Sequence, residues 1–161
     1  MRWTGLAWIA LLFITSCKSR LEKSEMSKAT QVEVPTDFYL SLKKTVCFGQ
    51  CPAYEFQIQA QGELLWEGHY FVSKIGRYRR ILSPSELSSL YSRLESAKLE
   101  QYQSVYDEQS ISDLPSAILK YRAKGLSHEI TCRYRCPSEL LELIGDLERR
   151  ADTVALRPAK P

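Results

Sequence analysis

The sequence predicts an α+β domain in which two amphipathic helices pack on one face of a six-stranded antiparallel sheet. Two observations predict it. Several segments alternate polar and apolar residues, which is typical of half-buried strands, and two others repeat apolar residues three and four apart, which is typical of helices. The expected order along the chain is ββββαββα, within one domain over residues 38–152.

The first four strands are expected to form an antiparallel meander. Turn signals at Gln61-Gly62 and Ile75-Gly76 separate the later strands, and "CFGQCP" connects the first two. The strand segments are "FYLSLKKTV" (38–46), "AYEFQIQA" (53–60), "ELLWEGHYFVSK" (63–74) and "RYRRIL" (77–82).

The first helix, "SPSELSSLYSRLESAK" (83–98), has the clearest start signal. Ser83 with Glu86 three residues later forms a capping box, and Pro84 suits the first helical position. An irregular stretch over 99–116 follows, and a second hairpin turns at Lys124-Gly125.

The last helix is expected in "CPSELLELIGDLERRAD" (136–152). Its start repeats "SPSEL" with cysteine in place of serine, so Cys136 is expected at the N-cap of this helix. Residues 153–161 are expected to form a disordered tail.

The first 16 residues are typical of a lipoprotein signal peptide. Arg2 precedes an apolar run over 5–14 that is too short to span a bilayer permanently. The following "ITSC" resembles the lipobox of bacterial lipoproteins, which implies lipid attachment to Cys17 and cleavage before it. Because more than one acyl chain anchors a protein stably, we expect a partner membrane held through Cys17. The alternative is a plain signal peptide followed by a coincidental cysteine.

We therefore expect a lipid-anchored protein of the cell envelope. Lys18 favours the outer membrane, because an aspartate at this position would suggest retention at the inner membrane. Residues 17–37 are polar and lack apolar periodicity, so they are expected to form a flexible tether. Loss of Arg2 with the signal peptide lowers the net charge from +3 to +2, which does not favour a polyanionic partner such as nucleic acid.

Four further cysteines form two C-x-x-x-C pairs: Cys47, Cys51, Cys132 and Cys136. An even number of cysteines in an oxidising compartment is typical of a disulfide framework. Pairing within each motif is the preferred connectivity, since Gly49 allows a sharp turn, but a sheet that joins the motifs could also cross-link them.

Metal and redox alternatives use the same four cysteines. Four thiolates could hold tetrahedral zinc, although the spacing is unspecific. "CFGQCP" resembles the C-x-x-x-C-P motif of copper chaperones of cytochrome oxidase assembly, in which thiolates bind Cu(I). Cys136 at a helix start could also be a reactive thiol. We prefer the interpretation of these cysteines as disulfides, and we expect no cofactor and no metal.

Few residues point to catalysis. The sequence contains no Ser-His-Asp arrangement, P-loop, dinucleotide fingerprint or zinc-protease motif. Asp107, Glu108 and Asp113 could pair as carboxylates, but acidic loop residues are usually solvated, so we expect no enzyme. Basic residues could form a cationic sheet face for an anionic envelope ligand; these are Lys74, Arg77, Arg79, Arg80, Lys120, Arg122 and Lys124.

These features together resemble a bacterial lipoprotein family, the one catalogued as domain of unknown function 6438. The resemblance covers about residues 38–150 and is carried by "LSLKKTVCFGQCPAYEFQIQAQGELLWEGH", "SPSEL" and "SDLPSAILKY", most specifically by "CFGQCPAY". The family implies no known activity. It is expected to have a glycine-containing turn where this sequence has "CRYRC", and that departure implies a bond between Cys132 and Cys136. We expect a non-catalytic binding or envelope-assembly module.

Overall fold

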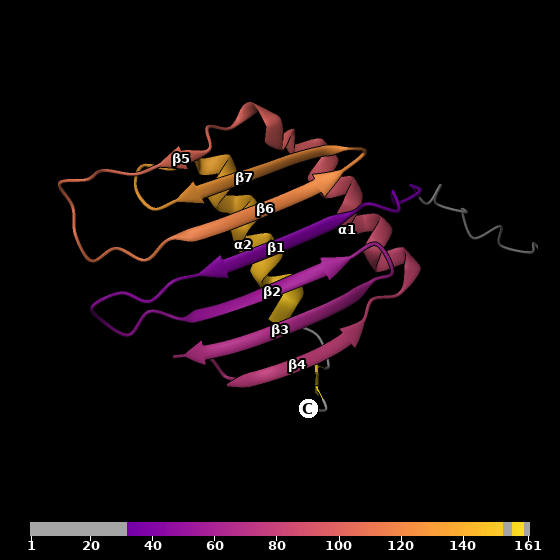
Figure 1. The fold of residues 1–161 in the computed structure, drawn as a ribbon, viewed down its shortest axis with the longest axis horizontal. Helices are drawn as coiled ribbons and strands as arrows, with labels where there is room; N and C mark the ends of the chain where they lie inside the picture. The colour runs from indigo at the N-terminus through magenta and orange to yellow at the C-terminus, as the bar shows by residue number, and fades with distance from the viewer. Residues whose placement is uncertain (1–31, 153–155, 160–161) are drawn as a thin grey trace, which may run out of the picture.

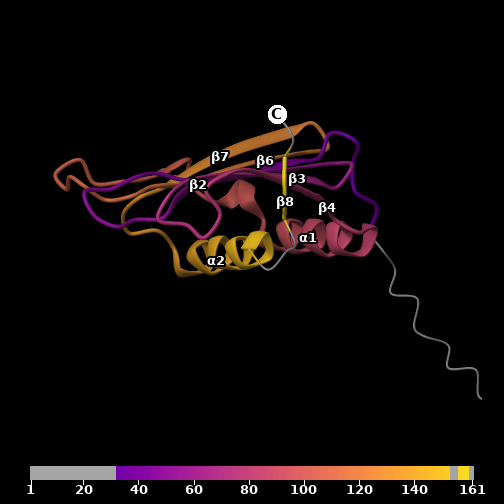
Figure 2. The ribbon, with the colours of Figure 1, turned by 90° about the horizontal axis from the view of Figure 1, so that it is seen from below.

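Eight strands form one sheet (Figure 1), and both helices lie on the same face of it (Figure 2). The structure is a computed structural model that describes residues 32–152 and 156–159. The signal peptide, Cys17 and most of the tether lie outside the described residues. In chain order the elements are β1 (Tyr39–Lys44), β2 (Ala53–Gln59), β3 (Glu63–Tyr70), β4 (Gly76–Ile81), α1 (Pro84–Ala97), η1 (Leu99–Gln101), β5 (Val105–Tyr106), β6 (Ala117–Ala123), β7 (Leu126–Cys132), α2 (Ser138–Asp152) and β8 (Arg157–Pro158).

The strand order is β5-β7-β6-β1-β2-β3-β4-β8, and every neighbouring pair is antiparallel except β5 with β7. The prediction of a six-stranded antiparallel sheet is therefore wrong. β5 lies in the stretch expected to be irregular, and β8 lies in the stretch expected to be a tail. Each has two residues, too few to show an alternation, and Pro158 is compatible only with an edge strand.

The core lies between the sheet and the helices. Alternate residues of the central strands face the helices and are almost fully buried, whereas no helix covers the other face of the sheet among the described residues. The largest fully buried side chains include Leu40, Leu42, Phe56, Leu64, Leu119 and Ile130 from the strands, with Leu90, Tyr91, Leu94, Leu140, Leu143 and Leu147 from the helices. Each such side chain stabilises the fold by roughly 1.5–3 kcal/mol through burial.

The predicted start of α1 is confirmed. The Ser83 hydroxyl accepts a hydrogen bond from the Glu86 backbone N–H at 3.3 Å, and the Glu86 carboxylate accepts one from the Ser83 backbone N–H at 2.7 Å. These bonds satisfy two N–H groups that the first helical turn leaves without a partner. Pro84 occupies the first helical position.

α2 begins one residue later than the match with "SPSEL" predicts. Its first residue is Ser138, and the Leu141 backbone N–H donates to the Pro137 carbonyl at 3.1 Å, so Pro137 has the N-cap backbone role expected of Cys136. The sulfur of Cys136 is bonded to Cys132 and cannot replace the hydroxyl that caps α1. The identical letters therefore predict the helix but not its first residue.

Candidate functional site

Both cysteine pairs lie at one end of the sheet, which we call the disulfide end. β1, β3, β5 and β7 end there, whereas β2, β4 and β6 begin there. Four loops lie at this end because each of them follows a strand that ends there (Figure 1). They span residues 45–52, 71–75, 107–116 and 133–137.

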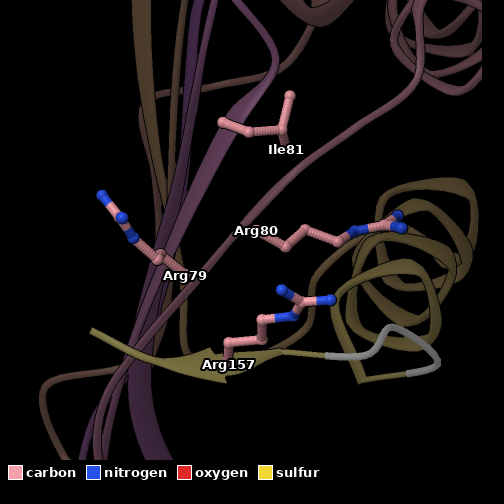
Figure 3. A pocket seen from close by; sticks show the side chains of 4 residues that line it. All are labelled: Arg79, Arg80, Ile81 and Arg157. Carbon is pink, nitrogen blue, oxygen red and sulfur yellow. The ribbon is translucent and has the colours of Figure 1, made fainter. Parts of the chain in front are cut away.

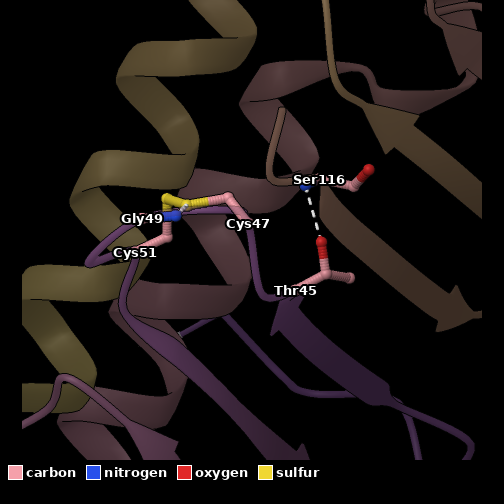
Figure 4. The surroundings of a disulfide bond; sticks show 5 residues. All are labelled: Thr45, Cys47, Gly49, Cys51 and Ser116. Atoms are coloured by element: carbon pink, nitrogen blue, oxygen red, sulfur yellow. Dashed lines mark hydrogen bonds between the residues drawn. A yellow bond between two sulfur atoms is a disulfide. The ribbon is translucent and has the colours of Figure 1, made fainter. Parts of the chain in front are cut away.

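The first disulfide joins Cys47 to Cys51 across the loop between β1 and β2, with Cα atoms 5.7 Å apart (Figure 4). Inside this loop the Gly49 backbone N–H donates to the Cys47 sulfur at 3.2 Å. At its start, Thr45 exchanges two hydrogen bonds with Ser116, the residue that precedes β6. The loop is thus closed on itself and fixed to the next strand.

The second disulfide joins Cys132, the last residue of β7, to Cys136, two residues before α2, with Cα atoms 5.8 Å apart. Cys132 belongs to the core and is only 5% exposed. Arg135 between the two cysteines has a φ of 51°, in the left-handed region that permits a sharp turn. The expectation of disulfide bonds is confirmed, and each bond lies within its own motif.

The four cysteines are therefore not free thiolates in this oxidised form. A thiolate is the species that binds zinc or Cu(I) and that attacks another disulfide, so either chemistry requires reduction first. Among residues 32–152 and 156–159, no three side chains of His, Cys, Asp or Glu converge in a group that could hold a metal ion.

The acidic residues of the 107–116 loop have local structural partners. Asp107 pairs with Arg133 at 2.7 Å, and the same guanidinium donates to the Ile111 carbonyl at 2.6 Å. Glu108 accepts from the backbone and the hydroxyl of Ser110. These contacts hold the loop against the end of β7, so the carboxylates stabilise its conformation.

The seven basic residues expected on one sheet face do not form a single patch. The basic residues of β4 and of β6 are separated by β1, β2 and β3. At least four of the seven make ion pairs: Arg77 with Glu67, Arg80 with Glu86, Lys120 with Glu129 and Lys124 with Glu95. The predicted cationic face is thus divided by strand order and reduced by nearby carboxylates.

Large apolar side chains are exposed at the disulfide end. Phe48, at the tip of the loop closed by the first disulfide, is 92% exposed. We call these residues the apolar rim: Val46, Phe48, Tyr70, Phe71 and Ile75. They come from the loops 45–52 and 71–75 and from the adjoining end of β3. Clustered exposed apolar residues are typical of interaction surfaces, whereas single ones are common on any protein.

The 71–75 loop is held in place by Trp66. Its indole N–H donates to the Lys74 carbonyl at 3.0 Å. That carbonyl lies so close to Gly68 that a Cβ there would come within 1.9 Å of it, so only glycine fits at this position. Phe71 has a φ of 52°, a conformation that is unfavourable for a bulky residue and that concentrates at functional sites.

A pocket of about 410 Å³ lies beside the apolar rim, between the two rim loops and α2. On its floor Glu148 of α2 accepts a hydrogen bond from the Tyr54 hydroxyl at 2.6 Å and pairs with Lys44 at 3.3 Å. The pocket is lined by Lys44, Pro52, Tyr54, Trp66, Phe71, Val72, Ser73, Glu148 and Arg149. It combines apolar walls with a few fixed polar groups, as ligand and peptide sites do.

The apolar rim is not among the sites predicted from the sequence. The alternation in "ELLWEGHYFVSK" assigned Phe71 to a strand, whereas β3 ends at Tyr70 and Phe71 begins the loop. The available signal was the presence of bulky apolar residues, Val46 and Phe48, in and beside a turn that has no core to face.

Among the described residues, no helix has the length and apolar character needed to cross a membrane.

Comparison with known proteins identifies one family. A search of curated proteins found no match to this chain. The profile of the family described as Domain of unknown function (DUF6438) matches residues 38–151, which include both disulfides, α1 and all of α2 except its last residue. This chain therefore belongs to the DUF6438 family.

Proposed function

We propose that the chain is a lipid-anchored protein of the cell envelope, held at the outer membrane through Cys17, and that its domain is a non-catalytic module that binds another envelope protein. The apolar rim at the disulfide end is the observation that carries the proposal. Its five side chains are apolar and exposed, and they come from two loops and the adjoining end of β3, all at the same end of the sheet.

The rim is suited to binding because its loops are ordered before a partner arrives. The Cys47–Cys51 disulfide closes one loop, and the Trp66 hydrogen bond to Lys74 holds the other. A preorganised surface loses less conformational entropy on binding than a flexible one. Burial of Phe48 alone would contribute roughly 1.5–3 kcal/mol to a complex.

The position at which the chain enters the domain supports a rim that faces away from the membrane. β1 begins at Tyr39, at the end of the sheet opposite the apolar rim, so a tether that leads to Cys17 joins the far end. Residues 17–37 can span at most about 70 Å when fully extended. A domain anchored in this way can present the rim to a partner away from the membrane.

Photo-crosslinking tests the binding surface. A photoreactive phenylalanine analogue replaces Phe48 in one variant and Leu126 in the control; Leu126 is 68% exposed and lies at the opposite end of the sheet. In intact cells we expect a discrete crosslinked protein from position 48 and none from position 126. Equal crosslinking from both positions, or none from position 48, would contradict the assignment of the rim.

Fractionation tests the anchor separately. Cys17→Ser is expected to leave the protein uncleaved or soluble in the periplasm, because the lipid attachment site is lost. Cys51→Ser is the matched control and should fractionate with membranes like the unaltered chain. Unchanged membrane fractionation of Cys17→Ser would contradict the lipid anchor without affecting the crosslinking result.

A second candidate function is thiol exchange or Cu(I) or zinc binding. It is favoured by the Gly49 N–H that donates to the Cys47 sulfur, since such a bond would stabilise a thiolate after reduction. Intact mass with and without reductant and alkylating agent separates the two candidates. Disulfides that persist in the envelope, with no bound metal, would support the binding module, whereas free thiols with bound metal would support the alternative.

A further inference from the structure

A second pocket, of about 430 Å³, lies at the edge of the sheet where β4 meets β8. It is lined by three arginines and one isoleucine: Arg79, Arg80, Ile81 and Arg157 (Figure 3). This pocket lies towards the end of β4 that leads into α1, whereas the apolar rim lies where β4 begins.

β8 brings the third arginine to the pocket. Arg157 is the register partner of Arg79, and the Ala159 backbone N–H donates to the Arg77 carbonyl at 3.0 Å. β8 thus forms the edge of the sheet and adds the guanidinium group of a residue 78 positions further along the chain than Arg79.

The charges at this pocket are not balanced. Arg80 pairs with Glu86 at 2.9 Å, but Arg79 and Arg157 make no ion pair with any of the residues that the structure describes. Three guanidinium groups and one carboxylate leave an excess of two positive charges. In a concave site such an excess attracts anions more strongly than the same charges would on a flat surface.

Arg80 also has an unused hydrogen-bond donor. Its side chain is 20% exposed, and its Nε is buried with no partner among the described residues. A buried donor that lacks a partner is unfavourable unless a ligand or water satisfies it.

The guanidinium groups of Arg80 and Arg157 extend to the same side of β4, whereas that of Arg79 extends to the other (Figure 3). Arg80 and Arg157 are therefore the pair placed to hold one anion.

We propose that this pocket binds a phosphate group, with Arg80 and Arg157 as its hydrogen-bond donors and Arg79 contributing charge. A phosphomonoester carries up to about two negative charges, which matches the excess of positive charge. The planar fork of arginine fits the paired oxygens of phosphate. The volume exceeds that of a bare ion, and Ile81 can contact the apolar part of a larger phosphorylated molecule.

Binding to defined phosphate compounds tests this site in the full-length chain. The protein is purified in a neutral maltoside detergent and titrated calorimetrically with inorganic phosphate, then with mixed micelles that contain phosphatidic acid or, as the neutral comparison, phosphatidylcholine. Arg157→Gln is the main variant, because the residue is exposed and outside the core. Arg122→Gln, an exposed arginine on β6, is the matched control.

We expect Arg157→Gln and Arg80→Gln to weaken phosphate binding at least about tenfold and Arg122→Gln to leave it unchanged. Binding of inorganic phosphate would indicate a soluble phosphate compound, and binding of phosphatidic acid micelles alone would indicate a lipid headgroup; both support the site. Arg80→Gln also removes the ion pair with Glu86 and can destabilise the start of α1. The result for Arg157→Gln therefore decides the outcome. Absence of binding to every phosphate probe, or equal weakening by Arg122→Gln, would overturn the proposal.

Discussion

Thr45 and Ser116 join β1 and β6, which are neighbours in the sheet, through a pair of hydrogen bonds. The Thr45 backbone N–H donates to the Ser116 carbonyl at 3.0 Å, and the Ser116 backbone N–H donates to the Thr45 hydroxyl at 2.8 Å (Figure 4). The two residues are 71 positions apart in the sequence. They extend the β1–β6 pairing beyond its last regular pair, Lys44 with Ala117, up to the start of the first disulfide loop.

Thr45→Val is expected to lower the free energy of unfolding by about 1–3 kcal/mol. Valine keeps the shape of threonine but leaves the Ser116 N–H without an acceptor in a partly buried position. Chemical denaturation of the domain measures the change. Thr45→Ser keeps the hydroxyl and serves as the control, so a loss of stability as large in Thr45→Ser would contradict the role given to this hydrogen bond.

The two disulfides are expected to differ in their contribution to stability. Each closes a loop of the same length, so the chain-entropy contribution is about 2 kcal/mol for both. Cys132 is buried in the core, whereas neither Cys47 nor Cys51 belongs to it. Replacement of the second pair by alanine should therefore cost more than replacement of the first, since it also removes core contacts.

Denaturation of the two double variants, Cys47→Ala with Cys51→Ala and Cys132→Ala with Cys136→Ala, measures this difference. Each variant serves as the control for the other, because both lose one loop closure of equal length. The first variant should also reduce crosslinking from position 48, because the loop that carries Phe48 is no longer closed. Equal losses of stability would show that burial of Cys132 contributes nothing beyond loop closure.

The parts of the fold that sequence reasoning found are those encoded locally. Ser83, Pro84 and Glu86 lie within four residues, and the capping box that they form depends on little else. β5 and β8 were missed because two-residue strands have no period and their partners, β7 and β4, lie far away in the sequence. Their pairing is decided by tertiary contacts, which no local pattern records.

The candidate site also has features that the sequence predicts and features that depend on tertiary structure. The disulfides could be predicted because an even number of cysteines in a chain expected to be exported is typical of a disulfide framework, although the spacing alone left metal and redox alternatives open. The exposure of Phe48 and Phe71 was not found, because it depends on where the loops lie relative to α2 and the sheet. The arginine pocket depends on the pairing of β8 with β4 and could not be predicted before that pairing was known.

Stability is expected to fall in acid because carboxylates hold the β6–β7 turn. Hydrogen bonds from the backbone N–H groups of Gly125 and Lys124 lower the pKa of Asp37 below its ordinary value. A hydrogen bond from the Lys124 ammonium, followed by one from the Tyr121 hydroxyl, lowers the pKa of Glu95. Because both pKa values are lower in the folded state, the unfolded state binds more protons as the pH falls.

The stabilising contribution is thus complete above the unfolded pKa values and is lost as the pH falls through the folded ones, from about pH 4.5 downward. Denaturation at a series of pH values measures this slope. Asp37→Asn should lower stability at neutral pH and flatten the slope in acid, since residue 37 no longer titrates. An unchanged slope in Asp37→Asn would contradict the assignment of the acid sensitivity to this turn.

Gly68→Ala is expected to disturb the apolar rim from within the sheet. The added Cβ would lie 1.9 Å from the Lys74 carbonyl, which must therefore move and break its hydrogen bond from the Trp66 indole at 3.0 Å. Overpacking of this kind costs about 1–3 kcal/mol, and loss of the bond releases the loop that carries Phe71 and Ile75. We expect lower stability together with weaker crosslinking from position 48 or 71.

Gly145→Ala on α2 is the matched control, because its Cβ meets only the flexible end of Arg149 at 3.4 Å and helical alanine is favourable. If Gly68→Ala were as stable as Gly145→Ala, the close approach at Gly68 would not be what positions the loop.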